Sequence, residues 1–173
     1  GPARAAIERE CARLAALADD LLGACVDADR VEAASDEPLC HLLEDVARRV
    51  EGATGRGVTV RVDPPLRDAL ADRSLARAIG NVAENAARHA RRQPVAITAR
   101  RVDDVIEIEV ADDGDGFDDG FVVRPFRPGR GPGRAGLGLA SAARIARRAG
   151  GTLAVGGHKG GIVAVRVPEQ VSR

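Results

Sequence analysis

Apolar positions follow helical spacing in some stretches of the chain and alternate with polar ones in others. A four- and three-residue spacing predicts a helix over residues 1–30, with an apolar seam of Ile7, Cys11, Leu14, Ala18, Leu21 and Cys25. Further helices are predicted at about 38–50, 72–90 and 137–149. The first seam is typical of a bundle or coiled-coil helix, which needs partners from another chain or from an upstream segment. Packing on its own domain is the alternative.

Alternating residues predict strands at 58–62, 95–101, 105–110, 152–155 and 162–167. Short turns join several neighbouring strands, and helices lie between the others. This order indicates a two-layer α/β sandwich with a largely antiparallel or mixed sheet, and it argues against a doubly wound fold.

Composition narrows the class of protein. A chain of 173 residues is about one domain with an appendage, and its 26 basic and 26 acidic side chains balance. Three Phe with no Trp or Tyr argue against a base-stacking nucleic-acid platform, so we expect no nucleic-acid partner. Three widely spaced cysteines without a CxxC pair predict reduced thiols inside the cell. Gly1-Pro2 resembles a protease remnant, and we expect the natural protein to extend upstream.

The polar face of the 72–90 helix holds the first candidate site. Asn81 and Asn85 lie four residues apart there, where a plain surface helix would favour Glu, Lys or Arg. Carboxamide oxygens are hard ligands that suit Mg²⁺ and add no negative charge beside a triphosphate. We therefore predict a magnesium site, with Arg88 and His89 meeting phosphate oxygens. A solvated surface is the alternative, and it would suffice for Arg88 alone.

An acidic, glycine-containing loop follows the predicted strand 105–110. The spacing of its carboxylates does not fit a calcium loop, and a turn with excess acid is the bland alternative. We interpret Asp112 as the acceptor for the exocyclic amine of adenine. Gly114 and Gly116 would let the backbone approach the base.

Glycines also precede the predicted helix 137–149. The literal GxGxxG at 131–136 lacks a preceding strand and a following acid, so a dinucleotide fingerprint is rejected. Free N–H groups at the helix start still make an anion site. Residues 120–168 contain no acid but eight Arg and Lys159, which favours phosphate over a nucleic-acid patch.

Taken in order, these motifs resemble the ATP-binding catalytic domain of sensor histidine kinases. Residues 81–89 resemble the N box, 112–116 the DxGxG box, 121–126 the F box and 136–139 the second glycine box. The resemblance covers about residues 38–168. It implies a Bergerat-type mixed sheet covered by helices on one face, which binds ATP and Mg²⁺.

The resemblance also implies roles for single residues. Asn85 and Asn81 would bind the metal, and Asp112 the adenine. The lid would span about 116–135. Its usual cation position is Pro128 here, so Arg127 and Arg130 are the candidate catalytic cations. The nucleotide-binding set implied by the motifs is Asn81, Asn85, Arg88, His89, Asp112, Gly114, Gly116, Arg134, Gly136, Leu137 and Gly138.

Two departures shape the functional interpretation. Hydrolysing relatives and anti-sigma serine kinases carry a general-base Glu where this chain has Asn81. No phosphoacceptor box is present, because neither His41 nor His158 has the expected surroundings. We interpret residues 1–30 as the second helix of a dimerisation and phosphotransfer domain, and 31–173 as the catalytic domain.

The expected function is therefore transfer of the ATP γ-phosphoryl group to a histidine on an upstream helix. The expected partners are the protein's own helices in a homodimer and a response regulator. We expect a cytoplasmic domain of a membrane-anchored protein. The alternative is a nucleotide-binding regulatory module or an anti-sigma-like serine kinase.

Overall fold

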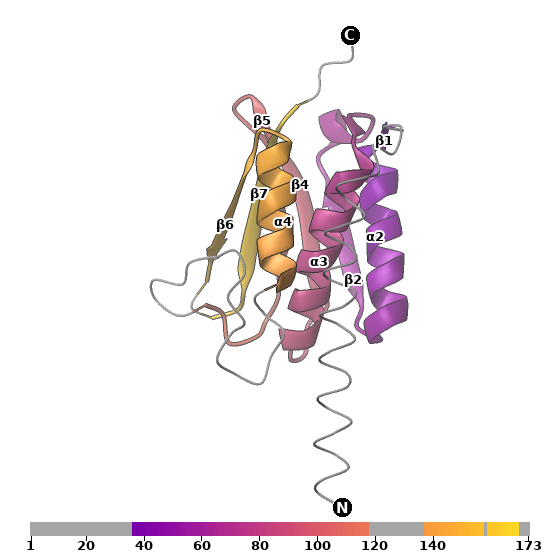
Figure 1. Ribbon diagram of the computed structural model, residues 1–173. Coiled ribbons are helices and arrows are strands. Elements are labelled where there is room, and N and C mark those ends of the chain that lie inside the picture. Colours follow the sequence, from indigo (N-terminus) through magenta and orange to yellow (C-terminus); the bar gives the residue numbers. More distant parts are fainter. Residues whose placement is uncertain (1–35, 118–136, 158, 170–173) are drawn as a thin grey trace, which may run out of the picture.

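The computed structural model describes residues 36–117, 137–157 and 159–169 (Figure 1). The predicted helix at 1–30 and most of the predicted lid lie outside the described residues. The elements in chain order are β1 (Glu37–Pro38), α2 (Leu39–Thr54), β2 (Val58–Val62), the short 3-10 helix η1 (Pro64–Leu66), β3 (Leu70–Ala71), α3 (Arg73–His89), β4 (Val95–Val102), β5 (Val105–Ala111), α4 (Leu137–Arg148), β6 (Thr152–Gly156) and β7 (Ile162–Pro168).

Five strands form one mixed sheet in the order β2-β4-β5-β7-β6. β2 pairs parallel with β4, and the remaining pairs are antiparallel. α3 connects the two parallel strands, as a parallel pair requires. Figure 1 shows α2, α3 and α4 side by side over one face of the sheet. The predicted two-layer sandwich with a mixed sheet is confirmed.

The core lies between the helices and this covered face. Alternate residues of the central strands are buried there (Val95, Ile97, Ala99, Ile106, Ile108, Val110, Val163, Val165 and Val167). α3 lies between α2 and α4 and contacts both. Its predicted apolar side is buried as expected (Leu75, Ile79, Val82, Ala86 and Ala90). The opposite side of α3 is thereby left for polar residues, which positions the candidate site.

Two local features differ from the sequence prediction. α2 begins after Pro38, not with it, because Glu37 and Pro38 pair with β3 as a two-residue strand. α2 also continues past Gly52 to Thr54. Gly55 caps its end in a left-handed conformation and donates its N–H to the Glu51 carbonyl. Gly52 is exposed in the last turns, so it weakens the helix without stopping it.

The sheet face opposite the helices, which no other described element covers, has a charged centre. Glu107 of β5 lies between Arg100 of β4 and Arg166 of β7 in the strand register. Glu107 Oε1 accepts from Arg100 Nε at 2.8 Å and Nη2 at 2.6 Å, and Oε2 accepts from Arg166 Nε at 2.6 Å. The glutamate is only 2% exposed, because the two arginines cover it. Their hydrogen bonds lower its pKa below the ordinary value.

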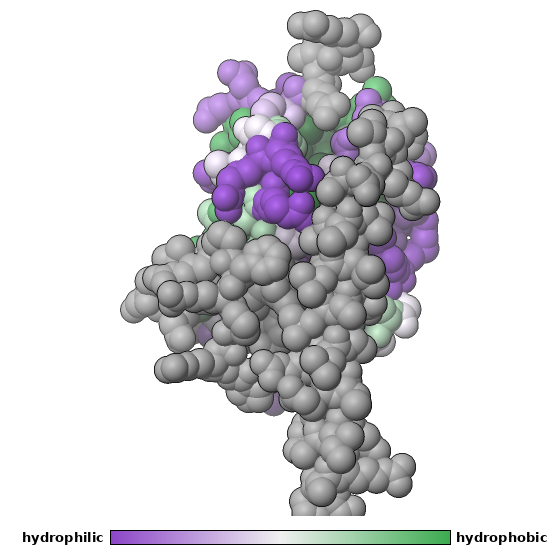
Figure 2. Space-filling view, in the orientation of Figure 1, coloured by the Kyte–Doolittle hydropathy of each residue, from purple (hydrophilic) through white to green (hydrophobic). Residues whose placement is uncertain are grey.

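Hydrophilic side chains gather over the part of the helical face that is visible in Figure 2. Within the described ranges, every helix is too short or too polar to cross a bilayer.

Candidate nucleotide site

The two predicted metal ligands lie on the polar side of α3. Asp72 caps the start of this helix, accepting from the Ser74 N–H at 2.5 Å. Asn81 and Asn85 are both half-buried on the helix that this cap begins. Neither carboxamide makes a side-chain hydrogen bond to another described residue. Two carboxamide oxygens one helical turn apart, with no side-chain partner among the described residues, fit the chemistry of a Mg²⁺ site.

The start of α4 lies against α3 at Asn81. A Cβ added at Gly138 would lie 3.5 Å from the Asn81 carbonyl oxygen and 3.8 Å from its Cβ. The first turn of a helix has N–H groups without intrahelical partners. The fold therefore brings the start of α4, the predicted anion site, next to Asn81.

Asp112 follows β5 and is fixed by backbone groups. Its N–H donates to the Gly161 carbonyl at 2.9 Å. Its Oδ1 accepts from the N–H of Gly114 at 2.8 Å and of Gly161 at 3.3 Å. Both donors point at one carboxylate oxygen, and Oδ2 accepts no hydrogen bond from the residues that the structure describes.

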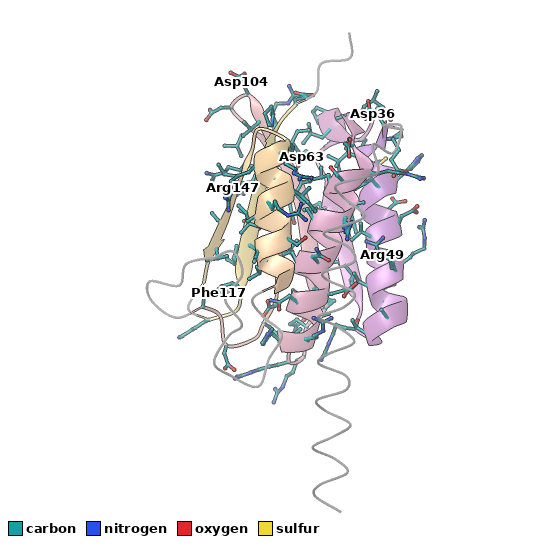
Figure 3. All side chains as sticks on the ribbon, in the orientation of Figure 1. Asp36, Arg49, Asp63, Asp104, Phe117 and Arg147 are labelled. Atoms are coloured by element: carbon teal, nitrogen blue, oxygen red, sulfur yellow. The ribbon has the colours of Figure 1, made fainter. Side chains whose placement is uncertain are left out.

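The two predicted glycines of this loop are needed for different reasons. A Cβ at Gly114 would lie 2.6 Å from the His89 carbonyl oxygen, so the loop packs directly on the end of α3. Gly116 has φ +80°, a conformation that residues with a Cβ rarely adopt. The next residue, Phe117, donates its N–H to the Gly157 carbonyl at 2.9 Å. Figure 3 places Phe117 and Asp104, the latter in the β4–β5 turn, near opposite ends of the sheet.

Asp113 is a site residue that the sequence analysis did not single out. Its carboxylate accepts from the N–H groups of Arg91 at 2.7 Å, Arg92 at 2.9 Å and Gln93 at 3.0 Å. These bonds, with that of Gln93 foremost, lower its pKa to about 2. Arg91 also pairs with Asp115. Asp113 thus fastens the acidic loop 112–116 to the turn that follows α3. In the sequence, only its position beside Asp112 indicated a role.

The remaining predicted residues have mixed positions. Arg88 is partly exposed and pairs with Glu84 one turn earlier at 3.2 Å, and His89 is exposed. Arg127, Arg130, Arg134 and Gly136 lie outside the described residues, and Leu137 begins α4.

A cavity of about 270 Å³ opens elsewhere, between α2, β2 and η1. It is lined by Cys40, His41, Glu44, Val60, Val62 and Arg67, and therefore by none of the candidate nucleotide residues.

Comparison with known proteins agrees with this arrangement. Residues 71–171, more than half of the chain, match the family described as histidine kinase-, DNA gyrase B-, and HSP90-like ATPase. A Mycobacterium tuberculosis protein (strain CDC 1551 / Oshkosh) named "Probable sensor histidine kinase HK" is 35% identical over 95% of this chain and 45% of its own length. The sensor histidine kinase component HK1 of M. tuberculosis H37Rv is 34% identical over 75% of this chain and 78% of its own.

Solved structures show the same fold. The structure of full-length ShkA in complex with AMPPNP matches with a TM-score of 0.73 at 27% identity. The match covers 92% of this chain and 36% of ShkA. The catalytic domain of the histidine kinase ThkA has a TM-score of 0.64 at 18% identity, covering 78% of this chain and 97% of its own.

The chain belongs to the histidine kinase-, DNA gyrase B-, and HSP90-like ATPase family. Within this family its relatives are sensor histidine kinases, and the chain is an ATP-binding catalytic domain of that type. It spans less than half the length of the relative HK.

Proposed function

We propose that this domain binds Mg·ATP and, in the intact protein, transfers the γ-phosphoryl group to a histidine of an upstream helix. The observation that supports this best is the meeting of three features at one end of α3. These are the carboxamides of Asn81 and Asn85, which bond to no side chain of the described part of the chain, the start of α4 and the fixed carboxylate of Asp112.

Each feature suits one part of the nucleotide. Oδ2 of Asp112 accepts from the adenine amine, whereas guanine presents a carbonyl there and would leave two acceptors facing each other. The N–H groups at the start of α4 suit phosphate oxygens. Arg88 can add to them after leaving Glu84, a pair of exposed side chains that costs little to break.

Asn85, with Asn81 as second ligand, would hold the metal. When bound, Mg²⁺ neutralises charge on the phosphates, which is much of what phosphoryl transfer requires. Arg127 and Arg130 are our candidates for the cations that stabilise the transferring group, and Arg134, Gly136 and Leu137 for further phosphate contacts.

Asn81 also bears on the class of reaction. In hydrolysing relatives the resemblance implies a general-base Glu at this position, but an amide cannot accept a proton from water. We therefore assign transfer to a protein acceptor, with slow hydrolysis at most. The partners we propose are a second copy, joined through the upstream helices, and a response regulator. The proposed setting is the cytoplasmic side of the cell membrane, to which the full-length protein is anchored.

Calorimetric titration of Mg·ATP tests the site. Asn85→Ala should weaken binding by tenfold or more and remove its dependence on Mg²⁺, while the fold stays intact because the residue faces away from the core. Asn81→Ala should weaken binding less. Gln93→Ala is the matched control, because it removes an exposed side-chain amide and keeps the backbone N–H that donates to Asp113. Unchanged Mg·ATP affinity in Asn85→Ala would contradict the assignment.

A further inference from the structure

The loop between α2 and β2 meets the end of α3. Its residue Arg56 is half-buried and belongs to none of the nucleotide motifs. Arg56 Nη2 donates to the Ala90 carbonyl at 2.9 Å, and Nη1 donates to the Arg91 carbonyl at 3.3 Å. Figure 1 shows α2 and α3 ending at the same end of the helical layer. One guanidinium thus joins a loop far upstream in the chain to the turn that follows α3.

The end of α3 suits a cation for two reasons. Carbonyl groups at the end of a helix lack intrahelical partners, and the C-terminal end of the helix dipole is negative. Ala90 is the C-cap of α3, with its N–H on the Ala86 carbonyl at 2.8 Å, and its own carbonyl accepts from Arg56. The rest of the loop follows the same turn, because the Gly57 carbonyl accepts from the Val95 N–H at 3.0 Å. Arg56 is therefore bound into the end of the helix, unlike an arginine that only covers a surface.

The turn after α3 is held from both sides. Its carbonyls bond to Arg56, and its three successive N–H groups bond to Asp113. The end of α3 also packs on Gly114, whose added Cβ would lie 2.6 Å from the His89 carbonyl oxygen. The loop 112–116 and the last turn of α3 therefore keep a fixed relation as long as both sets of bonds are present.

We propose that Arg56 is a positioning residue for the triphosphate. This inference rests on the proposed function, in which the last turns of α3 bind the metal and the phosphates through Asn85, Arg88 and His89. Arg56 is assigned no contact with the nucleotide, and it acts by fixing the helix end that carries these side chains. Without it, two carbonyls bond to water and the turn is held from one side. Ordering the phosphate-binding side chains then costs more free energy when the nucleotide binds.

Arg56→Ala tests this role with two nucleotides that differ in their phosphates. Mg·ATP uses the end of α3, whereas AMP lacks the β- and γ-phosphates and the metal that they hold. Affinities are measured by displacement of a fluorescent ATP analogue at a temperature where circular dichroism shows every variant folded. Arg56→Ala should weaken Mg·ATP binding by about fivefold or more and AMP binding by about twofold at most. A merely structural role would lower the melting temperature and leave the ratio of the two affinities unchanged.

Arg92→Ala is the matched control. The Arg92 side chain is exposed and makes no hydrogen bond or ion pair with a described residue, and the variant keeps the backbone N–H that donates to Asp113. It removes one positive charge from the same turn, so it reports a general loss of charge near the phosphates. Both affinities should stay within about twofold of wild type. An equal loss of Mg·ATP affinity in Arg92→Ala and Arg56→Ala would show that charge alone is responsible, and would overturn the proposal.

A second variant keeps the proposal testable if Arg56→Ala does not fold. Arg56→Lys keeps the positive charge at the helix end but donates from a single nitrogen, so it should lose part of the Mg·ATP affinity and none of the AMP affinity. Unchanged Mg·ATP affinity in a folded Arg56→Ala, or in Arg56→Lys if that variant alone folds, would overturn the proposal. An equal loss of affinity for both nucleotides would do the same. A wild-type domain that does not bind Mg·ATP would instead overturn the proposed function.

Discussion

At the scale of single residues, the two adjacent acids of the loop 112–116 make different bonds. Asp112 accepts from two backbone amides through Oδ1 alone, whereas Asp113 accepts from three consecutive backbone amides. The sequence predicted the role of Asp112 from its place at a strand end. It did not predict the role of Asp113, because the donors come from residues 91–93, which only the fold brings near.

The bonds to Asp113 make stability depend on pH in acid. Its pKa is 3.8 for a free side chain and about 2 in the fold, so the stabilisation is complete above about pH 4 and is lost as the pH falls toward 2. Asp113→Ala should therefore lower the melting temperature at pH 7, and its difference from wild type should shrink between pH 4 and 2. Thermal unfolding followed by circular dichroism across this range measures it. Asp115→Ala, which removes a single exposed ion pair, should change little. A difference in melting temperature between wild type and Asp113→Ala that persists to pH 2 would show that it does not come from the ionised Asp113 carboxylate.

At the scale of elements, periodicity identified the described helices α2, α3 and α4 and the five strands of the main sheet. Their ends were less certain, as α2 shows by passing the exposed Gly52. Two-residue strands such as β1 and β3 are too short to give a pattern. The sequence also did not predict which strands pair, because the hydrophobic alternation of β2 is the same whichever strand lies beside it.

The centre of the sheet depends on Glu107. Glu107→Ala removes hydrogen bonds from Arg100 and Arg166, which lie in the two strands beside β5. It should destabilise the domain by about 1–3 kcal/mol, as expected for bonds between charged groups. Glu107→Gln should cost less, since it keeps one acceptor oxygen. Urea unfolding gives both values. Asp104→Ala, at an exposed position in the β4–β5 turn, is the control. Equal free energies of unfolding for Asp104→Ala and Glu107→Ala would show that the bonds of Glu107 to the two arginines do not stabilise the domain.

At the scale of the whole molecule, the chain has an ATP site but no recognisable phosphoacceptor. Of its three histidines, His41 lines the separate cavity beside β2, and His89 is exposed at the end of α3. We expect the 173-residue chain to bind ATP without labelling itself, and to phosphorylate an added upstream helix pair only inefficiently. Lost tethering lowers the effective concentration of the acceptor. Radiolabelled ATP with the chain alone, then with the helix pair, measures this. Strong acid-labile labelling of the chain alone would contradict it.

The charged centre of the open sheet face also bears on association. A sheet covered on one side only invites a second sheet to stack on the other, which is a route to aggregation. Stacking here would strip water from Arg100 and Arg166 and bury the charges that they share with Glu107. Desolvating such groups costs several kcal/mol each. The group of Arg100, Glu107 and Arg166, which joins three strands, thus also keeps this face hydrated and opposes sheet stacking. The same side chains therefore contribute both to stability and to resistance against aggregation.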